Sequence, residues 1–104
     1  MSGLDRNGYA PSLLNKAENT CYLCGRTSGK LDRHEIFNGA YRQKSKKLGL
    51  WVSLCHFECH LNGVHNNAKM NRRLKQQAQK AAMKEYDWTI DEFRNQFSKN
   101  YLED

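Results

Sequence analysis

Four cysteines stand in two close pairs, a spacing that favours metal binding over disulfide formation. Two residues separate Cys21 from Cys24, and three separate Cys55 from Cys59. Four thiolates spaced in this way can meet in a tetrahedron, the closed geometry that zinc prefers in structural sites. Such paired spacing is hard to obtain by chance. We therefore predict a structural zinc ion that fastens the first cysteine pair to the second.

Three histidines near these cysteines indicate a second, open metal site. His34 lies between the cysteine pairs, His60 follows the fourth cysteine, and His65 comes five residues later. Imidazoles are good ligands for a catalytic divalent ion, and an open site can bind a phosphate oxygen. A five-residue step suits one helical face poorly, so we expect an irregular turn at Asn62-Gly63. In an alternative arrangement, His56 or His60 replaces one cysteine at the zinc.

The elements that must position these side chains follow from the local sequence. Leu31 to Phe37 is a short run that closes on a turn signal, Asn38-Gly39, and Gly49 to Leu54 is rich in β-formers. We predict two antiparallel strands there, with a helical turn or an irregular loop over 40–48. Residues 1–15 mix Gly, Asn, Ser and the only proline without a sustained period, and predict an irregular arm.

Two helices are predicted to follow the second cysteine pair. The segment from about 67 to 86 lacks Gly and Pro and is full of helix formers. Its apolar residues share one stripe at helical spacing: Met70, Leu74, Ala78 and Ala81. Thr89 and Glu92 fit a capping box, so a short C-terminal helix should run over about 90–101.

Length and composition fit one small domain that needs more than apolar burial. Of the 104 residues, 38% are hydrophobic and 27% are charged, so the core should be thin and a metal staple would add much stability. We expect a single domain over 16–104 with its core in 21–67. The first residues lack a signal-peptide pattern and no stretch approaches membrane-spanning length, which favours a soluble intracellular protein without a membrane partner.

The formal net charge of +6 is unevenly placed along the chain. Basic residues run without an acid over 66–84, a second basic group lies over 42–47, and the last twenty residues are acidic. A basic surface suits a polyanion. Arg42, Arg72 and Arg73 are candidates for phosphate contacts, because a guanidinium offers a bidentate fork. The alternative for all three is ordinary solvent-facing charge.

Taken together, these motifs resemble zinc-containing HNH endonucleases, most closely small phage and prophage members. The resemblance covers roughly residues 21–67 and depends on four motifs in order. They are Cys21-x-x-Cys24, Asp32-Arg33-His34-Glu35-Ile36-Phe37, Leu54-Cys55-x-x-x-Cys59-His60 and Gly63-Val64-His65. The resemblance implies an α+β protein with a small zinc-stapled ββα-metal (HNH) fold. To that fold this chain would add an extended basic helix and the short C-terminal helix.

In that family a metal ligand is followed directly by a histidine general base, and this chain departs from the pattern. With His34 as the ligand, the base position holds Glu35, a carboxylate that could accept a proton from water. With His34 as the base, Asp32 would have to supply the ligand, because Arg33 cannot bind a metal. We favour the first arrangement.

The other site residues are carried over from the same resemblance. His60 matches the position where the family places an Asn or His ligand at the start of the helix, and His65 would be a third ligand or a phosphate contact. The family's central asparagine has no clear counterpart in this chain, which is a further departure from the pattern; Asn38 is the only nearby candidate. The catalytic ion implied is Mg²⁺, Mn²⁺, Ni²⁺ or Zn²⁺.

The function expected from the resemblance is hydrolysis of DNA phosphodiester bonds with one catalytic divalent ion, in the cytoplasm of a bacterial or phage-infected cell. The partners expected are DNA, with RNA left open, and a second copy of the chain or a larger phage protein complex. One rival is a non-catalytic zinc-stapled nucleic-acid-binding module of the same fold. Another is an adaptor whose acidic C-terminal helix docks a protein such as a larger terminase or repair subunit.

Overall fold

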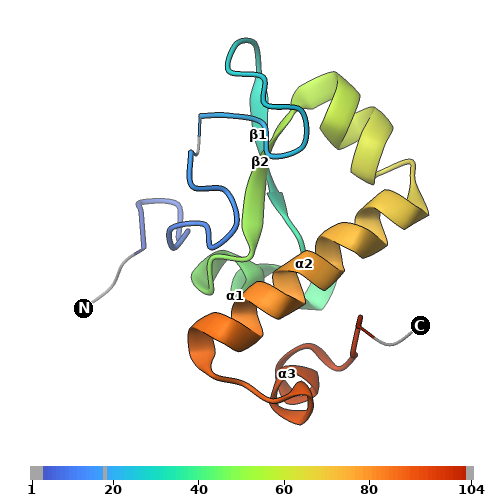
Figure 1. The fold of residues 1–104 in the computed structure, drawn as a ribbon. Helices are drawn as coiled ribbons and strands as arrows, with labels where there is room; N and C mark the ends of the chain where they lie inside the picture. The colour runs from blue at the N-terminus through green and yellow to red at the C-terminus, as the bar shows by residue number, and fades with distance from the viewer. Residues whose placement is uncertain (1–3, 18, 103–104) are drawn as a thin grey trace.

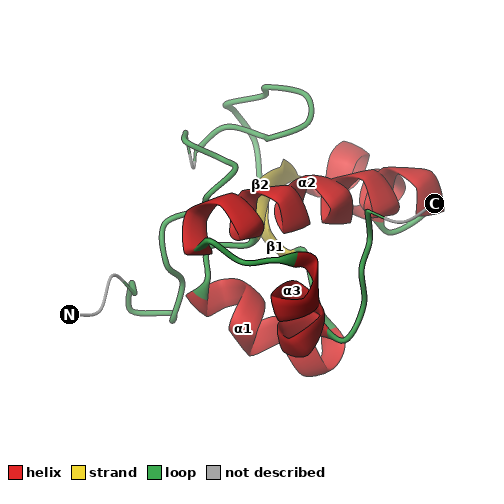
Figure 2. Ribbon diagram, turned by 60° about the horizontal axis from the view of Figure 1, so that its bottom comes forward, coloured by secondary structure: helices red, strands yellow, loops and turns green. Residues whose placement is uncertain are grey.

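The computed structural model describes residues 4–17 and 19–102 as an α+β arrangement, with helices gathered around one antiparallel hairpin (Figures 1 and 2). In chain order the elements are strand β1 (Leu31–Glu35), 3₁₀-helix η1 (Gly39–Tyr41), helix α1 (Arg42–Lys47), strand β2 (Trp51–Cys55), π-helix η2 (His56–Val64), helix α2 (Ala68–Tyr86) and helix α3 (Ile90–Phe97). No helix in the described parts of the chain is long and apolar enough to cross a membrane. The predicted α+β class is confirmed.

The hairpin brings the two halves of the candidate site together. β1 pairs with β2 in an antiparallel register that sets Leu31 opposite Cys55 and His34 opposite Val52. Both strands were predicted, but β1 ends two residues before the predicted Phe37. Phe37 lies past the strand in the apolar core, where it packs against the aromatic rings of α3.

The connection between the strands contains a short helix. α1 occupies most of the 40–48 segment, for which the sequence left a helical turn or an irregular loop open. Ser45, fully buried in α1, accepts a hydrogen bond from the backbone N–H of Phe37 and donates one to the carbonyl of Leu50. Gly49 ends the connection at φ 76°, where an added Cβ would lie 2.4 Å from the Pro11 carbonyl oxygen. This glycine is therefore required by close packing as well as by its backbone angle.

The N-terminal segment has no regular secondary structure over 4–17, in agreement with the predicted irregular arm, yet it is fastened along β2. The hydroxyl of Ser12 donates to the Trp51 carbonyl at 2.5 Å, and the amide oxygen of Asn15 accepts from the Ser53 N–H at 2.6 Å. Backbone groups on an open strand edge would otherwise remain without partners. The arm therefore covers the edge of β2 that β1 does not pair.

Helix α2 crosses the hairpin (Figure 1), and its buried apolar residues belong to the same core as those of the strands. Asn67 caps its first turn by accepting a hydrogen bond from the N–H of Met70. Leu74 and Ala78 are buried as predicted, but the next buried residue of the stripe is Ala82, four residues after Ala78, and not Ala81. The predicted bounds of this helix are confirmed to within one residue.

Helix α3 begins with the predicted capping box, in which Thr89 and Glu92 exchange hydrogen bonds. Its Phe93 and Phe97 are buried and pack on the ring of Phe37. The helix ends at Ser98, whose backbone is left-handed at φ 66°. The predicted extension to residue 101 is therefore wrong.

A buried side chain on α2 explains why the chain leaves the helix there. Gln79 is fully buried, donates to the side-chain oxygen of Asn100 at 2.8 Å, and accepts from the N–H of Tyr101 at 2.7 Å. Gln76 donates to the carbonyl of Tyr101 at 2.9 Å. Because a buried amide must be hydrogen-bonded, Gln79 holds the C-terminal segment against α2 in place of another helical turn.

Candidate metal centres and cleft

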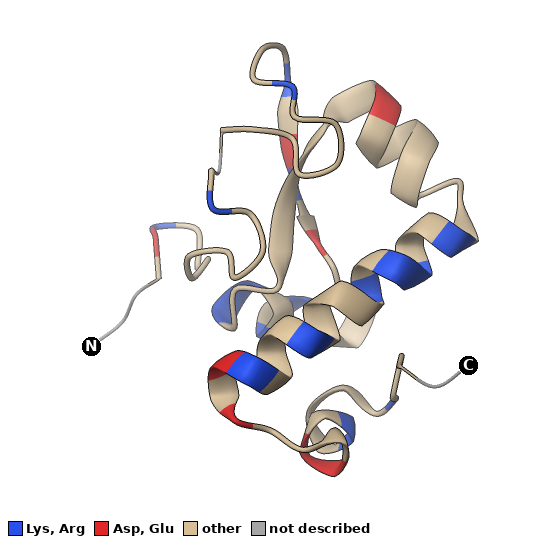
Figure 3. Ribbon diagram, viewed as in Figure 1, with Lys and Arg blue, Asp and Glu red and all other residues tan. Residues whose placement is uncertain are grey.

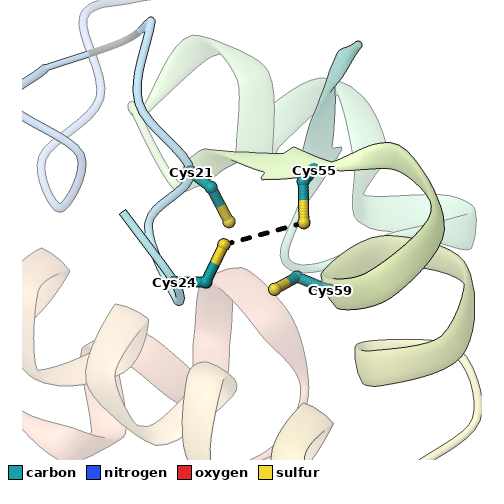
Figure 4. A group of neighbouring side chains, drawn as sticks. All are labelled: Cys21, Cys24, Cys55 and Cys59. Atoms are coloured by element: carbon teal, nitrogen blue, oxygen red, sulfur yellow. Dashed lines mark hydrogen bonds between the residues drawn. The ribbon is translucent and has the colours of Figure 1, made fainter. Parts of the chain in front are cut away.

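Four cysteine sulfurs converge where the segment before β1 meets the end of β2 (Figure 4). Cys21 and Cys24 lie on a tight turn, Cys55 ends β2, and Cys59 lies in η2. Each Sγ lies within 4.8 Å of the other three, and the Cys24 and Cys55 sulfurs are 3.8 Å apart. All four cysteines are free, so the predicted grouping is confirmed and could hold a metal ion in a shell of four sulfurs.

The surroundings of Cys21 and Cys59 shift the pKa values of these two thiols in opposite directions. Burial opposes the ionisation of Cys21, but backbone N–H groups directed at its sulfur lower its pKa to about 7. Burial and the neighbouring thiols raise the pKa of Cys59. A cation that contacts all four sulfurs would favour the thiolate form in each.

The two histidines considered as alternatives to a cysteine at the zinc lie beside Asp32. Nδ1 of His56 lies 2.5 Å from Oδ2 of Asp32, and Nδ1 of His60 lies 2.8 Å from the same oxygen. Both rings are therefore engaged by one carboxylate, whereas the sulfur group is complete without them.

The π-helix η2 sets the spacing of the two later histidines. In a π-helix each backbone N–H bonds to the carbonyl five residues earlier, and the His65 N–H donates to the His60 carbonyl at 3.2 Å. The expected irregular turn at Asn62-Gly63 is therefore wrong, because a five-residue step falls on one face of this kind of helix. Gly63 is buried within η2, where a Cβ would lie 3.1 Å from the Glu58 carbonyl oxygen.

The three predicted histidines meet at one point beneath a cleft. A ring nitrogen of each lies within 4.8 Å of the others, and Nε2 of His60 is 3.0 Å from Nε2 of His65. His34 is 5% exposed, and its Nε2 is buried without a hydrogen-bond partner among the described residues. A buried polar atom without a partner is rare and needs an explanation. An ion shared by the three imidazoles would supply one.

The charge state of His34 agrees with a role as a ligand. Burial, together with the positive charges that His60, His65 and Lys75 can carry, lowers its pKa to about 4. The ring is therefore neutral at neutral pH and keeps a nitrogen lone pair for a metal ion.

Asp32 has a role that the sequence did not reveal. Its Oδ2 receives the Nδ1 protons of both His56 and His60, so the Nε2 lone pair of His60 is left facing His65. Burial opposes the charge on Asp32, but these two donors lower its pKa overall. A carboxylate that fixes the tautomer of a ligating histidine is a recurrent feature of metal sites. The sequence signal was present in the i, i+2 spacing of Asp32 and His34, which places both on one face of β1.

The histidines form one wall of a cleft of about 560 Å³, a volume in the range of small-molecule and cofactor sites. Its lining residues are Arg33, His34, Glu35, Asn38, Gly39, Arg42, His60 and His65. Comparison of the chain with models of protein families, with curated proteins and with solved structures found no match. The role of the cleft is therefore argued from its own geometry and chemistry.

Glu35 is held on the wall of this cleft by two donors. Nε of Arg42 donates to its Oε1 at 2.9 Å, and the hydroxyl of Tyr9 donates to its Oε2. Burial and the neighbouring carboxylate raise the pKa of Tyr9 to about 12, so this hydroxyl remains protonated. The N-terminal arm, to which the sequence assigned no function, thus helps to build the cleft. Arg33, which lines the cleft beside it, stacks 4.4 Å over the Tyr9 ring and was missed as well.

The three arginines predicted to contact phosphate do not lie together. Arg42 lines the cleft, and its side chain is 58% exposed. Arg72 and Arg73 lie on α2, where Arg72 borders a separate, smaller cavity. Only Arg42 is placed beside the histidines. Asn38, named from the sequence as the only nearby candidate for a central asparagine, also lines the cleft.

Proposed function

We propose that this chain is a metal-dependent endonuclease of HNH type, which hydrolyses DNA phosphodiester bonds at the histidine cleft. One observation carries the proposal. The buried Nε2 of His34 has no hydrogen-bond partner in the described parts of the chain, and the His34 ring belongs to a group of three imidazoles at a 560 Å³ cleft. An arginine and a carboxylate line the same cleft, which suits a substrate that brings both a phosphate and an attacking water.

Zinc is the metal that we propose for the four-sulfur group. A tetrahedral zinc site with bonds of about 2.3 Å requires sulfurs about 3.8 Å apart. The Cys24 and Cys55 sulfurs are separated by 3.8 Å. Since Cys59 lies in η2, zinc would fasten η2 to the hairpin and thereby position the histidines that η2 carries.

The histidine group fits a catalytic divalent ion. Ligands at about 2.0–2.1 Å from an ion in tetrahedral or octahedral geometry lie roughly 2.9–3.4 Å from their neighbours, and Nε2 of His60 is 3.0 Å from Nε2 of His65. When bound, such an ion would polarise a phosphate oxygen and stabilise charge on the leaving 3′ oxygen. Three imidazoles favour zinc or nickel over magnesium, which prefers oxygen ligands.

The side chains around the ion have separate tasks in this proposal. His34, His60 and His65 bind it, and Asp32 orients His60. Glu35 accepts the proton of the attacking water after one of its two donors moves away. Arg42, which is one of these donors, is exposed beside the cleft. Its guanidinium can leave Glu35 and donate to a phosphate oxygen instead. The exchange would uncover Glu35 when the substrate enters.

Cleavage of supercoiled plasmid by the purified chain tests the proposal. Mg²⁺, Mn²⁺, Ni²⁺ and Zn²⁺ are supplied in turn, and the parent is compared with His34→Ala, His65→Ala and Glu35→Gln. Removal of a ligand or of the base should lower the nicking rate by at least about 100-fold. His65 is exposed, so His65→Ala reports on ligation even if His34→Ala disturbs the packing.

Matched controls separate loss of chemistry from loss of the fold. Glu58→Gln makes the same change as Glu35→Gln on an exposed residue of η2 and should leave nicking unchanged. Cys21→Ser should abolish nicking by unfolding the domain, which circular dichroism would detect. A folded parent that binds plasmid but never nicks it, with any of these ions and across pH 6–9, would refute the enzyme.

A second candidate function has one observation in its favour. Both oxygens of Glu35 are engaged, by Tyr9 and by Arg42, which is the state expected if Glu35 is structural. The chain would then be a non-catalytic zinc-stapled module that binds nucleic acid. Metal analysis distinguishes the two functions, because the module predicts one bound ion per chain and the enzyme predicts a second, weaker one.

A further inference from the structure

A second cavity, of about 150 Å³, lies between α2 and the segment that follows α3. Its lining residues are Ala68, Asn71, Arg72, Lys75, Lys99 and Tyr101. Three of these six carry a positive charge, and no acid is among them. All of its lining residues come after residue 67, outside the region that carries the family resemblance.

Hydrogen bonds hold the backbone that borders this cavity. The side chain of Gln79 donates to the side-chain oxygen of Asn100 and accepts from the N–H of Tyr101, and Gln76 donates to the Tyr101 carbonyl at 2.9 Å. These bonds keep the segment that carries Lys99 and Tyr101 against α2, so the cavity exists before any ligand arrives, which lowers the cost of binding.

Like charges are brought together in this cavity. The Nζ atoms of Lys75 and Lys99 lie 5.4 and 5.2 Å from the centroid of the same Tyr101 ring. Burial and the charge of Lys99 both lower the pKa of Lys75. Contact with an aromatic ring is worth only about 0.5–1 kcal/mol to an exposed cation, so it offsets part of this repulsion. An anion between the two ammonium groups would offset more.

This cavity lies close to the histidine cleft. Ala68, which lines the cavity, comes only three residues after His65, which lines the cleft. Basic side chains also follow α2 along its length, as Figure 3 shows. A polyanion that crosses the histidine cleft can therefore continue to the first turns of α2 along a surface whose electrostatic potential stays positive.

We propose that Arg72, Lys75 and Lys99 form a phosphate-binding subsite, which holds a backbone phosphate of the nucleic acid whose neighbouring phosphodiester lies at the histidine cleft. This proposal depends on the proposed function for its substrate. Two ammonium groups and one guanidinium suit the oxygens of a phosphodiester, and they contact no base, so the subsite adds affinity without sequence preference.

Fluorescence anisotropy with a labelled 20-base-pair DNA duplex, repeated over a range of salt concentrations, tests the subsite. All proteins carry His65→Ala, so that the probe is not cut. Lys75→Gln combined with Lys99→Gln should weaken binding by about tenfold or more at 0.1 M salt and reduce the salt slope by about one. Lys80→Gln combined with Lys84→Gln, on exposed positions of the same helix, makes the same change in net charge. It should weaken binding less than threefold and leave the slope unchanged.

The outcomes separate this proposal from the nuclease itself. Equal losses of DNA affinity in the two double variants would overturn the subsite, since a general attraction between positive charge and DNA would explain both. This conclusion would hold even if plasmid is still nicked. A selective loss at Lys75 and Lys99 supports the subsite even if no plasmid is ever nicked. An RNA duplex of the same sequence identifies the source of the phosphate. A selective loss with either probe supports the subsite, and its absence with both refutes it.

Discussion

The four-sulfur and three-imidazole groups lie within one small domain but differ in what surrounds them. Three of the four cysteines are buried, and their four sulfurs lie within 4.8 Å of one another. The histidines supply three nitrogens at the wall of a cleft. A closed shell suits a structural ion, whereas an incomplete shell leaves a coordination position for a substrate. The comparison teaches that ligand number and accessibility change together between the two groups, with four mostly buried sulfurs in one and three imidazoles at a cleft in the other.

The two groups also differ in how their ligands are held. Backbone N–H groups are directed at Cys21, so its surroundings depend on the path of the chain. His60 is instead held by the carboxylate of Asp32, which a single substitution can remove. Metal binding by the sulfur group should therefore be lost when the fold is lost, whereas metal binding by the histidine group should be weakened by a single substitution.

Removal of the ion from the sulfur group should have the largest effect. Structural zinc contributes roughly 10–16 kcal/mol of binding free energy in small peptides, which is as large as the whole stability of an ordinary domain, about 5–15 kcal/mol. Treatment with a strong chelator should abolish the cooperative thermal transition seen by circular dichroism, and zinc should restore it. A chain that melts at the same temperature after its zinc is shown to be removed would contradict a structural role.

Acid should weaken the histidine region through His34. Its folded-state pKa, about 4, lies below the ordinary value of 6.5, so the unfolded chain binds more protons between these values and stability falls as pH falls. At pH 5 the loss relative to pH 7 should be about 2 kcal/mol. Urea unfolding of the parent and of His34→Leu at both pH values measures the loss that is due to His34. Acid effects at the thiols are the same in the two proteins and therefore cancel in the comparison. Equal losses in the two proteins would remove His34 as the cause.

Asp32→Asn should weaken the histidine site and spare the sulfur site. An amide cannot hold His60 in the same way, and such changes typically cost 10–100-fold in metal affinity. Titration with Co²⁺, followed by its visible absorption, measures both sites in one experiment. Asp91→Asn, on an exposed face of α3, is the matched control and should leave both affinities unchanged. Equal weakening at both sites would show that Asp32 supports the fold and not the ligand.

Tyr9→Phe should give the smallest effect of the four. It removes the hydroxyl that donates to Glu35 and should lower the free energy of unfolding by about 1 kcal/mol. In the proposed enzyme it should also change the pH dependence of nicking, because Glu35 loses a donor. Tyr22→Phe, which removes a solvent-exposed hydrogen bond to Gln77, should change stability less and leave the pH profile unaltered. An unchanged pH profile in Tyr9→Phe would separate the arm from the chemistry.

Much of the framework could be predicted because its signals are local. Cysteine spacing indicated the sulfur group, β-forming runs indicated the strands, and Thr89 with Glu92 marked the start of α3. Each of these signals depends on neighbours within a few residues, and the same neighbours decide the structure. The histidine group could also be anticipated, since the cysteine group and the hairpin bring its segments together.

The errors fell where a distant partner decides the outcome. The C-terminal helix stops early because a buried Gln79 binds residues 100 and 101, which no helical period reveals. The five-residue step from His60 to His65 became regular only through a π-helix, a rare element that local propensity does not predict.

The sequence by itself determined which side chains are available as ligands and which elements carry them, because spacing and hydrophobic period act along the chain. Tertiary structure decided how these side chains are completed. It placed Asp32 behind His60, set Tyr9 and Arg42 on Glu35, and left Nε2 of His34 buried at the cleft. These contacts join residues from 7 to 28 positions apart. Only packing specifies them, since a hydrogen bond depends on distance in space and not on separation in sequence.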